Sequence, residues 1–182
     1  MTKKVTETDA ETGEETTKVL VCGFRPLPVF RYEDTEGESL PDYDYSPKTY
    51  PPFFDVAEKL GVSVEYRPMR ANFLGRYSPS MTNIQLCSQD AHVYYHELAH
   101  AIHNTFVDLK TYDTDKAEIV AEFTACVLCE LTKITGYETQ SYKYIKRYCG
   151  GEEKPEGVLK KIMGVLSEVE KIVLTVINTG KA

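Results

Sequence analysis

The first half of the chain alternates polar and apolar residues at the two-residue period of a β-strand. Residues 3–22 alternate on both sides of a polar stretch that ends at Gly13, which predicts a β-hairpin. Residues 26–32 indicate another strand. The same pattern predicts three more strands, over 62–66, 73–77 and 82–86. A short helix over 49–60 is expected between the strands at 3–32 and those at 62–86, with Gly61 ending it.

From residue 90 onward, apolar residues recur at helical spacing. Asp90 can cap the first helix of this half, which runs through residues 96–100. Further helices are predicted over 115–135, 139–148 and 155–177. Strands therefore come first and helices later, which predicts an α+β fold: an N-terminal β-hairpin and a small mixed sheet, followed by a helical half.

Composition narrows the class of protein. The 182 residues are 42% hydrophobic and 27% charged, as in soluble globular proteins. The N-terminus has no apolar signal core, so we expect a cytoplasmic location. Because nucleic-acid affinity rests mainly on Lys and Arg, the net charge of −7 argues against nucleic-acid binding by this chain alone. Oligomeric state is left open.

The most informative chemistry lies in His96-Glu97-Leu98-Ala99-His100. Two histidines four residues apart share one face of a helix, with roughly 6 Å between their β-carbons, and can bind one metal ion. Glu97 follows the first histidine, where its carboxylate can act on the attacking water. This H-E-x-x-H pattern is typical of zinc hydrolases, and the strand before it and the helix after it favour a genuine metal site.

A third ligand is expected from the next helix, since catalytic zinc usually has three protein ligands. Glu118 and Glu122 lie one turn apart in an otherwise apolar stripe, where acidic side chains are costly unless they are paired or bound to a cation. We favour Glu118 as the ligand and Glu122 as the group that orients a ligating histidine. The reverse assignment, or two ordinary surface acids, are the alternatives.

Other polar residues receive weaker assignments. His103 is interpreted as a helix-surface or ligand-supporting residue, and His92 as structural. The donor that stabilises the oxyanion is not identified, and four tyrosines are candidates: Tyr77, Tyr94, Tyr95 and Tyr112. The segment 82–86 either pairs with an extended substrate at a cleft edge or is an ordinary sheet strand.

Three segments carry a resemblance to a known family: Phe30–Gly37 with its Thr-Glu-Gly turn, Tyr95–His100, and Glu118–Phe123. Together they resemble the zincin-like metallopeptidase domain of ArdC-type antirestriction proteins. The Glu-x-x-Ala segment that begins at Glu118 is also similar to the third-ligand helix of ImmA/IrrE-type peptidases. In those peptidases the first glutamate binds the metal, so this resemblance implies Glu118 as the ligand.

The resemblance implies one zincin-like domain over 1–182, with 1–32 as the remnant of a preceding module that binds single-stranded DNA in family members. It implies a metal-dependent peptidase that hydrolyses an intracellular protein or peptide, with His96, His100 and Glu118 as metal ligands and Glu97 as the catalytic residue. Zinc is the expected ion, although this ligand set also suits Mn²⁺. The alternative is a non-enzymatic antirestriction or single-stranded-DNA-binding protein with a structural metal site.

Overall fold

The computed structural model describes residues 2–8, 15–21, 26, 28, 31, 34, 36–38, 44–69, 73–150 and 154–181. Contacts between residues divide the chain into two compact units, Met1–Asp42 and Tyr43–Ala182. The sequence predicts one domain whose hairpin region ends at residue 32. The two hairpin strands form a sheet of their own within the first unit, and the single-domain assignment stays a prediction.

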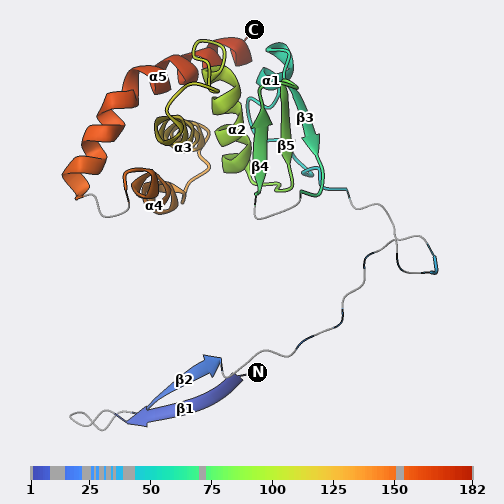
Figure 1. The fold of residues 1–182 in the computed structure, drawn as a ribbon, viewed down its shortest axis with the longest axis vertical. Coiled ribbons are helices and arrows are strands. Elements are labelled where there is room, and N and C mark those ends of the chain that lie inside the picture. The colour runs from blue at the N-terminus through green and yellow to red at the C-terminus, as the bar shows by residue number, and fades with distance from the viewer. Residues whose placement is uncertain are drawn as a thin grey trace. The chain divides into compact units, whose positions relative to one another are not determined.

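The first unit contains two antiparallel strands, β1 (Thr2–Thr8) and β2 (Glu15–Val21), shown in Figure 1. Thr2 pairs with Val21 at one end of the ladder. Both strands of the predicted hairpin are therefore confirmed, while its turn lies outside the described residues. The strand predicted over 26–32 is wrong at the residues described there, Pro26, Pro28 and Arg31. Proline has no N–H to donate to a strand ladder, which opposes a strand at this position.

The second unit begins with α1 (Asp55–Lys59), which is shorter than the predicted helix. Phe53 has a φ of 63°, and this left-handed backbone prevents an earlier helical start. Gly61 follows the helix with a φ of 73° and donates its N–H to the Glu58 carbonyl at 2.8 Å. The predicted glycine stop is thus confirmed, since glycine adopts this backbone without steric cost.

A three-stranded mixed sheet follows, made of β3 (Ser63–Tyr66), β4 (Gly75–Ser78) and β5 (Asn83–Leu86). The strand order is β3-β5-β4, with β5 parallel to β3 and antiparallel to β4. All three predicted strands are confirmed. However, β5 is central and both of its edges are paired, so the idea that residues 82–86 pair with a substrate is wrong. The strands at the two edges of the sheet are β3 and β4.

Four helices complete the unit: α2 (Ala91–His103), α3 (Thr114–Leu131), α4 (Glu138–Tyr148) and α5 (Pro155–Lys181). Asp90 caps α2 as predicted, accepting the His92 N–H at 3.0 Å. The third helix ends at Leu131, before the predicted limit, because Lys133 takes a left-handed backbone with a φ of 62°. The described residues therefore form an α+β fold with a small mixed sheet.

Helix α2 lies between the sheet and α3 (Figure 1) and contacts both. Its buried residues include Tyr94 and Tyr95, whose hydroxyls donate to the carbonyls of Phe54 and Pro52 at 3.0 and 2.9 Å. These bonds fix one side of α2 to the segment that precedes α1. Among the described helices, none has the length and apolar character needed to cross a membrane.

Candidate metal centre

Packing of α2 against α3 brings together the three predicted ligands. The nitrogens of His96 and His100 and a carboxylate oxygen of Glu118 all lie within 4.8 Å of one another. His96 Nε2 is 3.4 Å from Glu118 Oε2, and His100 Nε2 is 3.5 Å from Glu118 Oε1. Two imidazole nitrogens and one carboxylate oxygen form a donor set that zinc accepts. The geometry thus defines a candidate metal site, and ligation by these residues stays a prediction.

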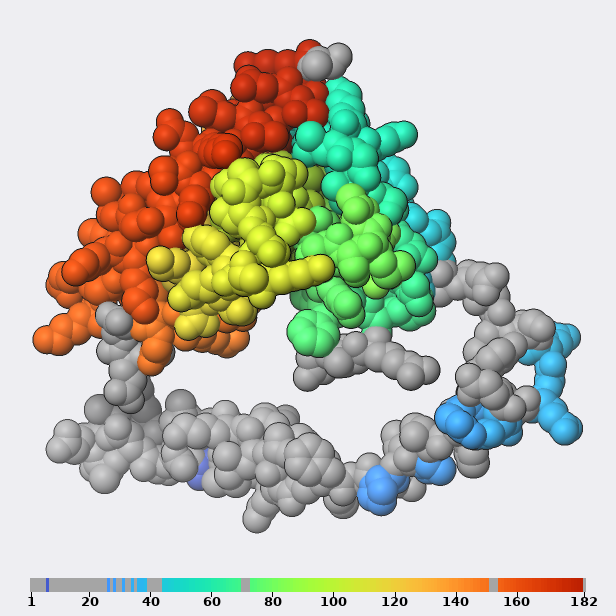
Figure 2. All heavy atoms as spheres, turned by 45° about the horizontal axis from the view of Figure 1, so that its top comes forward, coloured from blue at the N-terminus to red at the C-terminus, as the bar shows by residue number. Residues whose placement is uncertain are grey.

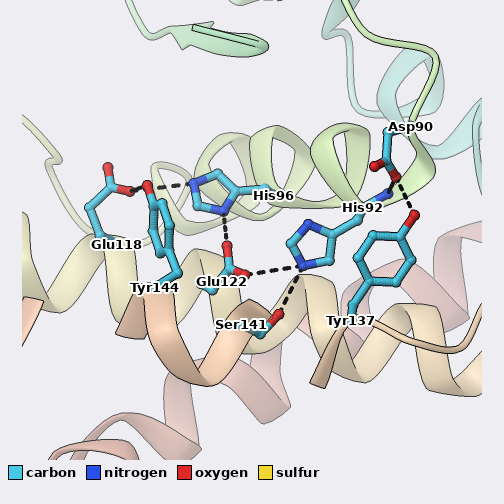
Figure 3. Close-up of polar contacts among 8 residues, drawn as sticks. All are labelled: Asp90, His92, His96, Glu118, Glu122, Tyr137, Ser141 and Tyr144. Carbon is cyan, nitrogen blue, oxygen red and sulfur yellow. Dashed lines mark hydrogen bonds and ion pairs between the residues drawn. The ribbon is translucent and has the colours of Figure 1, made fainter. Parts of the chain in front are cut away.

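The Glu122 carboxylate contacts the ring nitrogen of His96 that is not directed toward Glu118, as Figure 3 shows. Its side chain is buried, and its Oε2 is 3.0 Å from His96 Nδ1. This contact occupies one ring nitrogen and leaves Nε2 directed toward Glu118. A carboxylate in this position fixes the tautomer and orientation of a metal-binding imidazole. Glu122 therefore lies where the orienting role proposed from the sequence requires it.

His92 extends this polar chain away from the candidate ligands (Figure 3). Its Nε2 is 3.2 Å from Glu122 Oε1 and 3.1 Å from the Ser141 hydroxyl. The ring also stacks on Tyr137, with centroids 4.7 Å apart and planes 7° apart. Tyr137 donates in turn to Asp90 at 2.6 Å. His92 thus holds the Glu122 carboxylate in place, as expected of a structural histidine.

Electrostatics bind this cluster together. Burial raises the pKa of Glu122, but hydrogen bonds from His92 and His96 outweigh that effect and bring it to about 2. Burial likewise opposes ionisation of Glu118, yet His100 and His96 hold its pKa below the ordinary value. For His96, burial lowers the pKa, while Glu118 and Glu122 together raise it to about 10. Two buried carboxylates therefore attract positive charge to this point, which a divalent cation can supply as well as a proton.

Glu97 lies on α2 beside the candidate ligands and faces the sheet edge. Its side chain is 7% exposed, and burial raises the pKa of its carboxyl. A β-carbon added at Gly75 of β4 would lie 2.9 Å from both Cγ and Oε1 of Glu97, and 2.8 Å from Cγ1 of Val93. The backbone of Tyr77 also donates a hydrogen bond to the Glu97 carboxylate. Strand β4 therefore packs directly on this carboxylate.

Gly75 was not singled out from the sequence, although one signal was present. A glycine within an alternating strand often marks a place where another group approaches the backbone closely. The sequence contains eleven glycines, so the signal alone could not select this one.

Tyr144 is a second residue at the site that sequence reasoning missed. Its hydroxyl donates to Glu118 Oε2 at 2.8 Å, and its ring lies edge-on to His96 with centroids 5.7 Å apart. The hydroxyl is also 3.4 Å from that of Tyr148. With thirteen tyrosines in the chain, spacing offered no means to choose it. Tyr144 thus holds the carboxylate that α3 contributes.

The four tyrosines suggested by the sequence have different surroundings. Tyr77 lines the pocket at the site, but Tyr94 and Tyr95 direct their hydroxyls to carbonyls before α1. Tyr112 donates to Glu168 of α5 at 2.9 Å. Of the four, Tyr94, Tyr95 and Tyr112 are therefore wrong as oxyanion donors, because their hydroxyls are engaged elsewhere.

His103 is also not the helix-surface residue suggested by the sequence. It is fully buried, between the rings of Phe106 and Tyr112. Neither ring nitrogen has a hydrogen-bond partner among the described residues, and burial lowers its pKa. The neutral imidazole therefore acts as part of the packing at the end of α2.

The candidate ligands open onto a pocket of about 1140 Å³. His96, Glu97, His100 and Glu118 line it on the helical side. Strand β4 and neighbouring segments line it on the sheet side, and Figure 2 shows the green surface of the β4–β5 region beside the yellow surface at the start of α3. This volume exceeds the roughly 300–1,000 Å³ of typical small-ligand pockets, so there is room for a sizeable substrate.

The fold and site together define an α+β protein with a candidate His-His-Glu metal centre. Family models and curated proteins gave no match to the chain. Among solved structures, the chain is similar to the metal-free crystal structure of the antirestriction ArdC protein from the R388 plasmid. The two share 18% identity at a TM-score of 0.45, over 100% of this chain and 69% of that one. A likeness this remote carries no argument about function, which must come from the side chains.

Proposed function

We propose that this chain is a zincin-like, zinc-dependent peptidase. The observation that carries the proposal is the convergence of His96, His100 and Glu118 at a large pocket, with the buried carboxylate of Glu97 beside them. These groups are the parts that metal-assisted hydrolysis needs: ligands, a proton acceptor and space for a substrate.

The donor set supports a catalytic rather than a structural site. Structural zinc is usually enclosed by four protein ligands, whereas catalytic zinc has three and an open position. Within the part of the chain that the structure describes, the candidate group contains three residues, and all three line the pocket. When bound there, zinc would supply Lewis acidity, which polarises a substrate carbonyl and acidifies water.

Glu97 is the proposed general base. Its carboxylate is buried at the pocket beside the candidate ligands, where a proton acceptor can take a proton and return it later in the reaction. The carboxylate would take a proton from the attacking water and deliver it to the leaving amine. The contact with Gly75 and the hydrogen bond from Tyr77 keep the carboxylate at one position.

One edge of β4 is not paired with a described strand, and its backbone groups other than the Tyr77 N–H, which donates to Glu97, favour a polypeptide as the substrate. One side of β4 pairs with β5, and no described strand pairs with the other side. Residues 75–78 of this strand line the pocket together with the candidate ligands. An extended peptide can add to such an edge through its backbone hydrogen bonds, which would place a peptide bond near the metal.

Replacement of Glu97 by glutamine tests the proposal. The carboxamide has nearly the same shape but accepts no proton, so Glu97→Gln should retain one zinc per chain and lose hydrolysis of a peptide library. Glu170→Gln, at an exposed position on α5, is the matched control and should retain both properties. Undiminished hydrolysis by Glu97→Gln would refute the role of Glu97, and loss of zinc would show a different role.

Antirestriction is the second candidate function, and it is suggested only by the name of the structural neighbour. It would require no hydrolysis, with the metal stabilising the fold. In that case the Glu97→Gln variant would protect DNA from restriction to the same extent as the unmodified chain. Zinc would raise the melting temperature of the protein without supporting any peptide cleavage.

A further inference from the structure

Two arginines lie in the same pocket as the candidate metal centre. Among the described residues that line it, Arg67 and Arg76 are the cationic side chains other than histidine. The chain as a whole is acidic, with 28 Asp and Glu against 21 Lys and Arg. The sheet side of this pocket is therefore positively charged, whereas the whole chain has a negative net charge.

The sheet places these arginines on opposite sides of its central strand, β5. Arg67 directly follows β3 and donates its N–H to the Leu86 carbonyl at 2.8 Å. Arg76 belongs to β4 and follows Gly75, which pairs with the same Leu86. Two strand spacings, roughly 10 Å, therefore separate the two backbones. Arg76 and Glu65 both pair with Gln85, so these three side chains share one face of the sheet, and Arg67, two residues after Glu65, continues that face.

Both guanidinium groups are accessible to a ligand. Arg67 makes one long ion pair, with its guanidinium 3.6 Å from the Glu65 carboxylate, and about half of the Arg67 side chain is exposed. Among the described residues, no ion pair engages Arg76, which is also exposed. An exposed ion pair such as Arg67–Glu65 contributes little to folding stability, so a stabilising role does not account for the presence of the two arginines.

Exposed apolar side chains lie at the same rim. Phe73 is 63% exposed and Met81 is 68% exposed, and both line the pocket. Met69 and Pro79 line it as well. Flexible methionines and exposed apolar groups beside a free strand edge suit the mixed side chains of a polypeptide.

We propose that the pocket selects an acidic polypeptide segment, whose carboxylate side chains bind Arg67 and Arg76 while an adjoining apolar side chain contacts the Phe73 and Met81 rim. The inference rests on the proposed function, because it names the substrate class of that site. Arginine binds carboxylates through paired, charge-assisted hydrogen bonds, which provide selectivity as well as affinity. Nucleic acid is disfavoured, because the chain has a net charge of −7 and the described lining has only two such cations.

The test measures binding rather than cleavage. The full chain carrying Glu97→Gln is loaded with zinc and titrated against two fluorescent peptides, one with a central leucine flanked by glutamates and one with glutamines instead. We expect the acidic peptide to bind about tenfold more tightly, since two exposed ion pairs of about 0.7 kcal/mol each together contribute on the order of 1.4 kcal/mol. The preference should weaken as salt concentration rises.

Variants assign this preference to the arginines. Arg67→Gln and Arg76→Gln together should bring the affinity ratio close to one, and both positions are exposed, so folding should be retained. Arg147→Gln, an exposed arginine of α4 outside the pocket, is the matched control and should keep the full ratio. Equal affinity for the two peptides, or an unchanged ratio in the double variant, would overturn the proposal.

Two further outcomes separate this proposal from the peptidase proposal. Arginine-dependent binding of the acidic peptide, without cleavage by the unmodified zinc-loaded chain, would support the binding preference and reject the peptidase. Tighter binding of a short single-stranded DNA that requires the same two arginines would overturn the acidic-polypeptide proposal in favour of nucleic acid.

Discussion

Gly75→Ala is the most specific perturbation that the structure offers. The added β-carbon would lie 2.8 Å from Val93 Cγ1 and 2.9 Å from two atoms of Glu97. Ordinary contacts of this kind are 3.4 Å or longer, so the strand or the carboxylate must move by about half an ångström. Gly75 does not have a left-handed backbone, so the penalty comes from crowding and not from φ.

The magnitude follows from two opposing effects. Overpacking at a close contact costs about 1–3 kcal/mol, while alanine stabilises by about 0.4–1 kcal/mol through the unfolded chain. We therefore expect a net loss of about 1–2 kcal/mol in the free energy of unfolding. Because a displacement of about 1 Å can reduce turnover roughly 100-fold, kcat should fall by about 10- to 100-fold while zinc content stays at one per chain.

The assay combines urea unfolding, zinc analysis and peptide hydrolysis. Gly164→Ala is the control, because its β-carbon meets nothing within 4 Å in the middle of α5. That change should stabilise the chain by up to about 1 kcal/mol through helix propensity, with kcat unchanged. If Gly75→Ala matched Gly164→Ala in stability and activity, the reasoning that β4 positions Glu97 would be refuted.

Two further predictions concern the acids of α3. Glu118→Ala should abolish stoichiometric zinc binding, whereas Glu122→Ala should weaken it by about 10- to 100-fold, as measured by competition with a chromophoric chelator; the opposite order would exchange their roles. In metal-free protein, the lowered pKa of Glu122 stabilises the fold above its ordinary value of 4.5 and loses that effect as pH falls toward about 2. The raised pKa of His96 stabilises below its ordinary value of 6.5 and loses that effect as pH rises toward about 10. Melting temperature should therefore be highest between about pH 4.5 and 6.5, and Glu122→Gln should lessen the acidic decline, with the remainder due to the lowered pKa of Glu118; a flat profile would contradict this electrostatic account.

The sequence predicted the elements of the second unit because their patterns are local. The alternation over 62–66 and 82–86, the cap at Asp90 and the stop at Gly61 each act within a few residues. Strand order was not predictable in the same way, because pairing of β5 with both neighbours depends on contacts distant in sequence. For this reason the sequence left open whether residues 82–86 lie at a cleft edge or form an ordinary sheet strand, and the structure shows the latter.

The same distinction applies to the site. Helical spacing placed His96 and His100 on one face, and the cost of burying acids indicated Glu118 and Glu122. Tyr144 could not be inferred, since its contact with Glu118 depends on how α4 packs against α3. The role of Gly75 likewise appears only when β4 is placed against α2.

X-ray absorption at the zinc edge of the loaded chain tests the central claim most directly. The account predicts one tightly bound zinc with nitrogen and oxygen neighbours at about 2.0–2.1 Å, including two imidazoles, and loss of this signal in Glu118→Ala. Sulfur neighbours at about 2.3 Å, or a fourth protein ligand completing the shell, would contradict it.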